Sequence, residues 1–220
     1  MAVRRVVIIG AAGQAREVAY YIEDINRVAP TFTVAGFVVS DLSRLGAYDS
    51  KERVLGDFSW IERHLGELDG VVLGVGTPEF RGKLSRALCN AFPGLEWPAV
   101  VHPSVTLDRS TCTVGRGVLI GSGVTITVNV TLSDFAMLNF GCTVGHEARV
   151  GSASVVNPGA RISGGVVIGD GVLVGTGAVV LQYRSVGAGA TVGAGAVVTR
   201  DVEPEATVVG IPARPRPANA

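Results

Sequence analysis

Residues 162–197 read ISGGVV IGDGVL VGTGAV VLQYRS VGAGAT VGAGAV when they are divided into groups of six. Each group begins with Ile or Val, and the residue four places later is Val or Ala in every group except the one that holds Arg184. The same period extends over fifteen consecutive groups, whose first residues run from Val114 to Val198 and are all aliphatic. A fixed short period of this kind indicates a repeat architecture.

Six residues suffice for one short strand and one corner, so three groups close a triangular coil of eighteen residues. Stacked coils pair their backbones at a spacing of ~4.8 Å, and five coils therefore make a prism roughly 24 Å long with the aliphatic residues stacked along its axis. Glycine directly follows the aliphatic residue in eight of the fifteen groups, and we expect it to supply the positive φ of a sharp corner. Cys112 and Cys142 fall on the small inward positions and are interpreted as core residues.

The first hundred residues show a different pattern, in which short β-branched runs alternate with helix-like stretches. The runs predict strands over residues 6–9, 33–39 and 70–75, and helices over residues 14–25, 58–65 and 79–92. The inward faces are predicted from the spacing of their apolar residues: Ala15, Val18, Ala19 and Ile22 in the first helix, and Leu84, Ala87 and Leu88 in the last. Alternating strands and helices favour a small parallel sheet of doubly wound type that ends near Pro98.

The composition narrows the function classes. The chain has 220 residues, of which 47% are apolar and 17% charged, and 19 basic residues balance 19 acidic ones. The absence of a net charge argues against a role in binding nucleic acid or an anionic membrane, and no apolar run approaches the ~20 residues of a spanning helix. Three cysteines without C-x-x-C spacing predict neither a disulfide framework nor a zinc site, so we expect a cytoplasmic protein.

The chain has only three histidines. His64 lies in a predicted surface helix, and His102 lies where the repeats begin, which favours a structural role. His146 occupies the third place of its repeat group, so its side chain is expected to point outward near a corner, beside Glu147. Such a pair suits a general base near neutral pH. A solvated His–Glu pair on the surface fits this spacing equally well.

The segment from Gly10 to Gly13 follows the first predicted strand and opens the first helix. Free backbone N–H groups at a helix N-terminus suit a diphosphate. The segment lacks the full G-x-G-x-x-G pattern, so a nicotinamide cofactor is disfavoured. Arg81 and Lys83 are further candidates for contact with phosphate, although Lys83 also fits a solvated helix face.

Taken together, these motifs resemble a known family. The segment Leu138-Asn139-Phe-Gly-Cys-Thr-Val-Gly-His146-Glu147 is similar to the Asn-x6-His-Glu/Asp segment of the left-handed β-helix N-acetyltransferases that act on nucleotide-linked amino sugars of the bacillosamine type. The related sialic acid O-acetyltransferases share it. The resemblance covers the whole chain, including Gly10-Ala-Ala-Gly13-Gln14, Gly74-Val-Gly76 with Arg81 downstream, and the ending Val209-Gly-Ile-Pro-Ala-Arg214.

The resemblance implies two domains: a Rossmann-like α/β domain that binds the nucleotide sugar, residues 1–98, and a left-handed parallel β-helix that carries acetyl transfer, residues 99–220. It implies that His146 is the general base and that Glu147 supports it. It also implies acetyl-CoA as cosubstrate, a homotrimer with the cofactor between adjacent prisms, a nucleotide-linked amino sugar of polysaccharide biosynthesis as acceptor, and no metal.

The resemblance further assigns ligand contacts residue by residue. Asn139 is expected near the thioester of acetyl-CoA, and Thr176 and Ala194 are expected to contact the cofactor farther along the prism, mainly through backbone groups. The nucleotide sugar is expected to be lined by four residues of the first domain: Ala12, Gly13, Gln14 and Gly76.

The sequence departs from the family pattern at three places. Val155 replaces a second histidine, so positioning of the acetyl group is expected from backbone donors or from Asn157. Val39 and Ser40 precede Asp41 where relatives often carry two acidic residues, which leaves the nucleotide base open. Arg184 interrupts the repeat, and either the coil bulges there or the guanidinium reaches a CoA phosphate or a neighbouring subunit.

The sequence leaves two alternatives open, another acetyltransferase and a non-catalytic scaffold, and excludes a third. The His146–Glu147 pair would also serve O-acetylation of a free sugar such as sialic acid. A non-catalytic scaffold that binds sugar nucleotides would need no base at all. A β-helix carbonic anhydrase requires three histidines around zinc, and only His102 and His146 lie in the repeat region, so that class is excluded.

Overall fold

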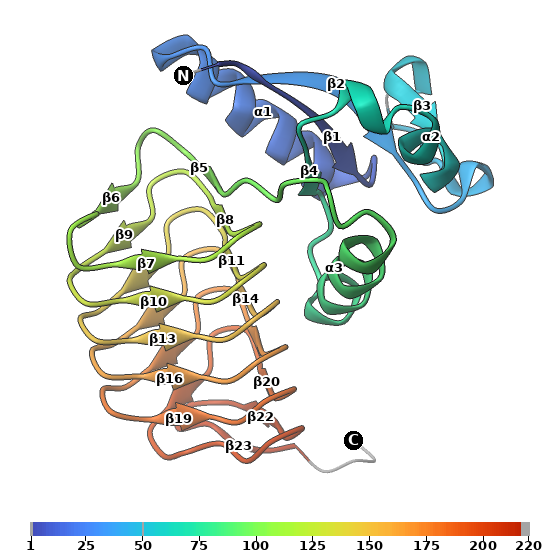
Figure 1. Ribbon diagram of the computed structural model, residues 1–220. Helices are drawn as coiled ribbons and strands as arrows, with labels where there is room; N and C mark the ends of the chain where they lie inside the picture. Colours follow the sequence, from blue (N-terminus) through green and yellow to red (C-terminus); the bar gives the residue numbers. More distant parts are fainter. Residues whose placement is uncertain (1, 50, 217–220) are drawn as a thin grey trace.

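The computed structural model describes residues 2–49 and 51–216. Figure 1 shows two parts: an α/β part formed by the first hundred residues, and a three-sided parallel β-helix formed by the rest, with the α/β part at the end of the prism where the coils begin. Residues 217–220, the end of the expected second domain, lie outside the described residues.

The α/β part is built on a four-stranded sheet with the order β3-β2-β1-β4, in which every neighbouring pair is parallel. Its elements are β1 (Arg4–Ile9), α1 (Gly13–Val28), β2 (Phe32–Val38), η1 (Leu42–Arg44), η2 (Lys51–Arg53), β3 (Val54–Gly56), α2 (Phe58–Arg63), η3 (Leu65–Glu67), β4 (Gly70–Leu73) and α3 (Pro78–Ala91). The three predicted strands and three predicted helices are therefore confirmed. The short edge strand β3 escaped prediction because three residues carry too little periodicity.

The buried faces of the helices agree with prediction for α1 and differ for α3. Ala15, Val18, Ala19 and Ile22 of α1 are buried as expected. In α3 the buried residues are Arg81, Gly82, Ser85 and Leu88, whereas Ala87 is exposed. The prediction that Ala87 faces inward is therefore wrong. The face of α3 that packs against the β-helix carries the buried Arg81, and a search for apolar spacing does not find a buried arginine.

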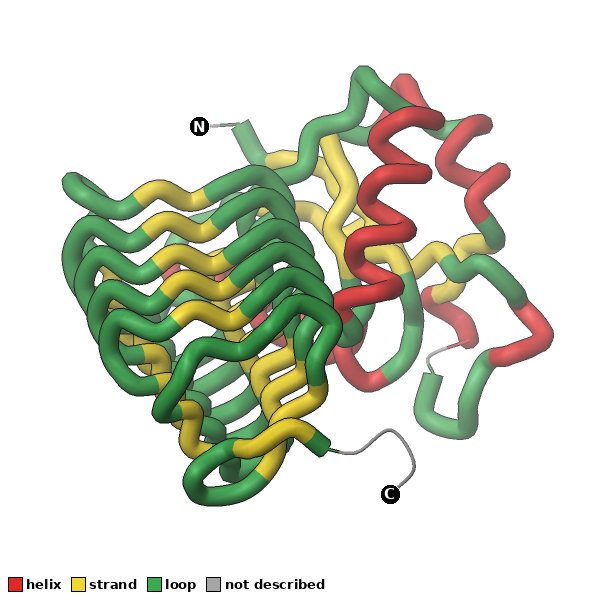
Figure 2. The backbone as a smooth tube through the Cα atoms, turned by 90° about the horizontal axis from the view of Figure 1, so that it is seen from below, coloured by secondary structure: helices red, strands yellow, loops and turns green. Residues whose placement is uncertain are grey.

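The β-helix consists of three sheets, which Figure 2 shows as the three sides of each coil. Sheet I contains β5 (Val100–Val101), β8 (Leu119–Ile120), β11 (Met137–Leu138), β14 (Val155–Val156), β17 (Leu173–Val174), β20 (Thr191–Val192), β22 (Thr207–Val209) and β23 (Arg214–Pro215). Sheet II contains β6 (Thr106–Leu107), β9 (Thr125–Ile126), β12 (Thr143–Val144), β15 (Arg161–Ile162), β18 (Val179–Val180) and β21 (Val197–Val198). Sheet III contains β7 (Thr113–Val114), β10 (Thr131–Leu132), β13 (Arg149–Val150), β16 (Val167–Ile168) and β19 (Ser185–Val186).

The repeat register agrees with the sequence. From β7 to β21, neighbouring strands of each sheet pair in parallel at an offset of eighteen residues, as in Leu138 with Val156 and Val144 with Ile162, whereas β23 pairs with β22 in antiparallel fashion. The aliphatic residues from Ile120 to Val198 that begin the groups are buried, together with the small residues four places later, and form one continuous core. These parallel sheets fit the expected left-handed β-helix. Stacking removes each aliphatic side chain from water, which stabilises the prism by about 25 cal/mol for each square ångström buried.

Arg184 does not distort this register. Val167 pairs with Ser185 at the usual offset, so the coil does not bulge. The guanidinium leaves the axis instead, and its Nη1 lies 3.8 Å from a carboxylate oxygen of Asp201. A half-exposed cation near a carboxylate avoids the cost of burying an unpaired charge.

The sharp corners fall elsewhere in the group than expected. Positive φ occurs three residues after the aliphatic residue, as at Gly165 (φ 66°) and Glu147 (φ 63°), and not directly after it. The glycine directly after the aliphatic residue has a different reason, which is close approach of the next coil: a Cβ at Gly145 would lie 2.5 Å from the backbone nitrogen of Gly164. The predicted position of the corner glycine is therefore wrong by two residues.

The β-helix begins earlier than the repeat in the sequence. Strands β5 and β6 precede the first recognised group, and seven residues instead of six separate Leu107 from Val114, which hides them from a strict six-residue period. After Val198 the last coil shortens, because Val192 pairs with Val208 at an offset of sixteen.

The α/β part packs on the outer face of sheet I. Buried side chains of α1 form one cluster with Leu119, Met137 and Val155 of that sheet. His102 adds a polar contact at the first coil, where its Nε2 lies 3.0 Å from Asp24 of α1 and its Nδ1 lies 2.7 Å from the Ser104 hydroxyl. The hydrogen bond from His102 lowers the pKa of Asp24. These contacts suit the structural role expected of His102.

Arg81 ties α3 to the β-helix. Its side chain is fully buried, and it donates to the backbone carbonyls of Phe135 and Val75, each at 2.9 Å. Burial lowers the pKa of Arg81 to about 9. Because every contact goes to the protein interior, Arg81 is placed as a link between the two parts of the chain and does not face a phosphate site.

Candidate active site

His146 and Glu147 lie on the corner between sheets II and III, which we call corner II–III and which also carries Val128, Gly164, Gly165, Gln182 and Tyr183. Both side chains are exposed, at 52% and 60%, and the Nδ1 of His146 lies 3.7 Å from a carboxylate oxygen of Glu147. The positive φ of Glu147 places it at the tip of the corner. An imidazole with one nitrogen facing a carboxylate and the other free is a suitable proton acceptor.

Gly164 of the next coil provides the space for the imidazole. A Cβ at Gly164 would lie 2.4 Å from Nε2 and 2.5 Å from Cε1 of His146. The ring therefore rests on bare backbone, and any larger residue at position 164 would push it away. The amide of Gly165 donates to the carbonyl of His146 at 2.7 Å, which fixes the backbone beneath the ring.

Asn139 lies on a different corner, between sheets I and II, which we call corner I–II. It is 6% exposed, and its amide donates to the Oδ1 of Asn157 in the next coil at 3.0 Å. Asn139 and His146 belong to the same coil, but the sheet II strand β12 separates their corners. One chain therefore does not bring these two predicted site residues together.

Thr176 and Ala194, the two other predicted cofactor residues, lie on the same corner as Asn139. They are exposed and occupy equivalent places in consecutive coils, where the amide of Gly195 donates to the carbonyl of Thr176 at 2.9 Å. The structure thus brings the three predicted cofactor residues into one column along the prism, within a single chain.

Corner I–II also carries a feature that the sequence analysis missed. Its five positive-φ positions are all glycine: Gly123, Gly141, Gly159, Gly177 and Gly195. A Cβ at the last four would meet nothing within 4 Å, so this glycine column is a flat strip of bare backbone. Four coil spacings make the strip roughly 19 Å long. The signal was present in the sequence as glycine at a spacing of eighteen, the coil length instead of the group length.

The predicted nucleotide-sugar residues come together at the carboxyl ends of two adjacent strands. Ala12, Gly13 and Gln14 open α1 after β1, and Gly76 follows β4, its Cβ position 3.4 Å from Oε1 of Gln14. Ala12 makes no side-chain cap, and the first turn of α1 carries no acidic residue. The Nε2 of Gln14 is buried without a hydrogen-bond partner in the described chain. Open helix N–H groups and an unpaired buried donor fit an anionic ligand.

Other residues singled out in the sequence have structural contacts. Val155 is fully buried beneath the α/β part, so a histidine at that place would point under α1. The carboxylate of Asp41 accepts from the amide of Ser43 as a helix cap. His64 stacks on Trp60, with ring centroids 4.1 Å apart.

Cys142 is buried in the core as expected, and burial raises its pKa to about 11, which suppresses the reactive thiolate.

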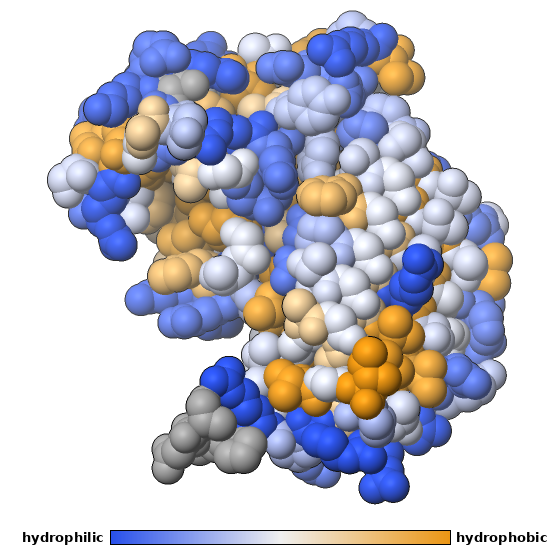
Figure 3. Space-filling model, turned by 180° about the vertical axis from the view of Figure 1, so that it is seen from behind, coloured by the Kyte–Doolittle hydropathy of each residue, from blue (hydrophilic) through white to orange (hydrophobic). Residues whose placement is uncertain are grey.

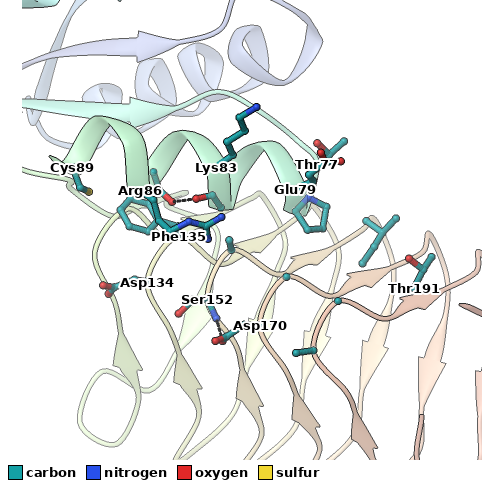
Figure 4. Close-up of a pocket in the computed structure, with 18 of the residues that line it drawn as sticks. Thr77, Glu79, Lys83, Arg86, Cys89, Asp134, Phe135, Ser152, Asp170 and Thr191 are labelled. Atoms are coloured by element: carbon teal, nitrogen blue, oxygen red, sulfur yellow. Dashed lines mark hydrogen bonds between the residues drawn. The ribbon is translucent and has the colours of Figure 1, made fainter. Parts of the chain in front are cut away.

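A cavity of about 1220 Å³ lies between α3 and the corner between sheets III and I, which we call corner III–I. Figure 3 shows the molecule hollowed between the α/β part and the β-helix. In Figure 4, Asp134, Ser152 and Asp170 line the β-helix wall below α3, and Lys83 points away from it. Of the residues predicted to contact a ligand, Lys83 alone borders this cavity, and the others lie elsewhere.

Residues 2–49 and 51–216 contain neither a metal-binding cluster nor a helix suited to span a membrane. No group of three or more His, Cys, Asp and Glu side chains is placed to hold a metal ion. No helix in those ranges combines the length and the apolar character needed to cross a bilayer.

Comparison with known proteins gives full-length structural matches. PerB from Caulobacter crescentus, solved with CoA and GDP-perosamine, is 30% identical over 98% of this chain and 99% of its own, with a TM-score of 0.87. The acetyltransferase domain of PglB from Neisseria gonorrhoeae FA1090, solved with acetyl coenzyme A, is 27% identical over 98% and 100%, with a TM-score of 0.85. No protein-family model and no curated protein sequence matches the chain.

The six-residue repeat and the full-length matches identify the chain as an acetyltransferase built on a hexapeptide repeat. A variant of the Caulobacter protein, solved as perosamine N-acetyltransferase with CoA and GDP-perosamine, matches at 28% identity over 98% of both chains, with a TM-score of 0.76. The chain belongs to this family of acetyl-CoA-dependent sugar N-acetyltransferases.

Proposed function

We propose that this protein transfers the acetyl group of acetyl-CoA to the amino group of a nucleotide-linked amino sugar. The observation that carries the proposal is the His146–Glu147 pair: an exposed imidazole with Nδ1 facing a carboxylate and Nε2 free above Gly164. It occurs in a chain that matches, over its full length, a protein solved with CoA and GDP-perosamine.

In the proposed reaction, the neutral sugar amine attacks the thioester carbonyl carbon. A C–N bond forms, the C–S bond breaks, and the sulfur leaves with its electron pair as the CoA thiolate. Nε2 of His146 accepts the proton that the amine loses, and Glu147 stabilises the resulting imidazolium. No acyl-enzyme and no metal take part in this direct route.

Acetyl-CoA is proposed to lie along corner I–II. Asn139 would contact the thioester, and Thr176 and Ala194 would contact the pantetheine arm. The glycine column would let this arm approach the backbone closely. The side chains of Asn139 and Asn157 already bind each other, so they form one fixed polar group at the end of the column nearest the α/β part.

The sugar nucleotide is proposed to bind the α/β part, which we take to be a Rossmann-like domain of residues 1–98, with the β-helix acetyltransferase domain over residues 99–220. Ala12, Gly13 and Gly76 would receive the diphosphate, and the unpaired Nε2 of Gln14 would donate to it or to the sugar. Binding there places the acceptor at the end of the prism where the coils begin (Figure 1).

A homotrimer is part of this proposal. Asn139 and His146 lie on different corners of one chain, so a complete site needs corner I–II of one copy beside corner II–III of another. Cyclic symmetry would give three identical sites of this kind. We also propose a cytoplasmic role in polysaccharide biosynthesis, where acetyl-CoA and nucleotide sugars are both present.

The experiment that tests the proposal is a thiol-release assay with acetyl-CoA and a panel of acceptors. The panel holds UDP-, GDP- and dTDP-linked 3-amino and 4-amino sugars, the corresponding hydroxy sugars, and free sialic acid. We expect CoA release with at least one amino sugar. Release only with hydroxyl acceptors would replace N-acetylation by O-acetylation, and no release with any acceptor would favour a binding scaffold.

A further inference from the structure

Tyr183 holds an unusual conformation on the same corner as His146. It has a φ of 55°, which a bulky residue rarely adopts and which strains the backbone. Its ring lies on Gly165, where a Cβ would come within 2.4 Å of the ring. The residue is nevertheless exposed at 64%, and the phenol makes no hydrogen bond within the described ranges. Within the described ranges its contacts are the packing of the ring on Gly165 and the hydrogen bond from its amide to the carbonyl of Gly164 at 3.0 Å, and the outer face of the ring is open.

Phe135 shows what the same arrangement does when it is covered. It also lies three residues after an aliphatic residue, has a φ of 61°, and rests its ring on the glycine eighteen residues before it, Gly117. Phe135 is buried because Trp97 meets it edge-on at 5.3 Å and Arg81 donates to its carbonyl. At this corner the aromatic ring that rests on a glycine is the surface against which the α/β part packs. Tyr183 is therefore expected to be covered by something outside its own chain.

The position of Tyr183 indicates which ligand covers it. Tyr183 follows Thr176 by seven residues, as His146 follows Asn139, so each pair spans the same two corners of one coil. Its ring lies over Gly165, and the His146 ring lies over the adjacent Gly164. Consecutive Cα atoms are about 3.8 Å apart, so the two rings are close enough for one extended ligand to contact both.

Direction along the prism separates the two substrates. The α/β part packs at the end where the coils begin, so the sugar nucleotide approaches His146 from that end. Tyr183 lies on the other side of His146, toward the coils that hold Thr176 and Ala194. A ligand that reaches His146 from those coils passes Tyr183, and in the proposed function that ligand is acetyl-CoA.

We propose that Tyr183 is a positioning residue that binds the pantetheine arm of acetyl-CoA held on corner I–II of a neighbouring copy. The ring packs on the arm between the thioester and the nucleotide, and the hydroxyl hydrogen-bonds one of its amide groups. Tyr183 thereby holds the thioester at the level of His146. This inference rests on the proposed function.

The test compares Tyr183→Ala and Tyr183→Phe with the wild type, by steady-state kinetics and by calorimetric titration with CoA. For Tyr183→Ala we expect the KM for acetyl-CoA and the Kd for CoA to rise on the order of tenfold, with the KM for the sugar nucleotide unchanged. For Tyr183→Phe, which keeps the ring, we expect a smaller rise of a few-fold.

Glu205→Ala is the matched control. Glu205 also has a positive φ, 59°, and lies over a glycine of the preceding coil, Gly189, but on corner III–I. It is expected to leave both KM values unchanged. An unchanged Kd for CoA in folded Tyr183→Ala would overturn the proposal, as would loss of the oligomer without a change in the KM for acetyl-CoA. Because CoA titration needs no acceptor, failure of acetyl transfer in the wild type would count against the proposed function alone.

Discussion

The imidazole of His146 depends on what stands beneath it as much as on its own chemistry. Gly164 has no side chain, so the imidazole ring of His146 packs directly on its backbone, with Nδ1 directed to Glu147. The side chain is half exposed and is not part of the buried core of the prism. Activity and stability are therefore separable at this corner.

His146→Ala is expected to lower kcat by ~10²–10⁴-fold, the usual contribution of a general base. The melting temperature should stay within about 1 °C of the wild type, because an exposed side chain contributes little to stability. Kinetics at saturating acetyl-CoA and a thermal melt check the two statements. Turnover close to that of the wild type would rule out His146 as the base.

Gly164→Ala tests whether the contact between Gly164 and the His146 imidazole positions the base. The new Cβ would fall 2.4 Å from Nε2 of His146, and the exposed ring is free to rotate away, so the fold should remain intact. We expect kcat to fall on the order of tenfold or more through misplacement of the base, with both KM values retained. Gly66→Ala is the control, since a Cβ there meets nothing within 4 Å. Equal kcat for both variants would contradict the placement of the imidazole.

At the scale of the element, each coil contributes three corners, which share one backbone conformation and differ in the residues they carry. Corner I–II has glycine at all five positive-φ positions, whereas corner II–III has Asn129, Glu147 and Tyr183 beside a single glycine, Gly165, at its own. Corner III–I lies beside α3 and its cavity. The backbone repeat therefore builds the scaffold, and the residues at the corner tips distinguish the three edges.

Gly177→Asn tests the glycine column. Asparagine tolerates positive φ, so the substitution adds a side chain to the strip at little cost to the fold. We expect the KM for acetyl-CoA to rise on the order of tenfold and kcat with saturating acetyl-CoA to change little. Gly171→Asn is the matched control on corner III–I, with a φ of 65° against 66° and equally open space. A similar KM in both variants would mean that the cofactor does not use the column.

At the scale of the whole molecule, the chain separates its two proposed ligands. Gly13 and Gly76 belong to the α/β part, and Ala194 belongs to the distant coils of the prism. Arg81 and the Asp24–His102 contact hold the two parts together, so binding at one part is expected to leave the other in place.

Gly13→Val is expected to raise the KM for the sugar nucleotide by crowding the diphosphate, with little change for acetyl-CoA. The fold should accept the change, because Gly13 has no positive φ and its Cβ position is 3.9 Å from the nearest atom, a guanidinium nitrogen of Arg16. A bulky substitution at Ala194 should do the reverse. Equal effects of both variants on both KM values, in folded protein, would contradict this division.

Mixing two inactive variants tests whether the site forms between copies. His146→Ala and Asn139→Ala chains, each expected to lose most activity alone, are unfolded together and refolded as mixed trimers. Random association in a cyclic trimer would place an intact His146 beside an intact Asn139 at about a quarter of the interfaces. Thiol release should recover to about a quarter of the wild-type rate. Absence of recovery, with mixed oligomers present, would indicate a site within one chain.

The sequence by itself determined the prism. The six-residue period from Val114 to Val198 places aliphatic residues on the axis, because only inward stacking removes all of them from water. It also determined three of the four strands and the three α-helices of the α/β part, and the outward position of His146, since each follows from a local period of burial.

Only the tertiary structure decided which residues share an edge of the prism. Corner tips eighteen residues apart align only when coils stack, which is why the glycine column and the ring of Tyr183 over Gly165 were not foreseen. The buried face of α3 likewise depends on carbonyls of a distant corner that receive Arg81. The separation of Asn139 from His146 has the same origin: seven residues span one side of the coil, and the closed triangle places them on different edges.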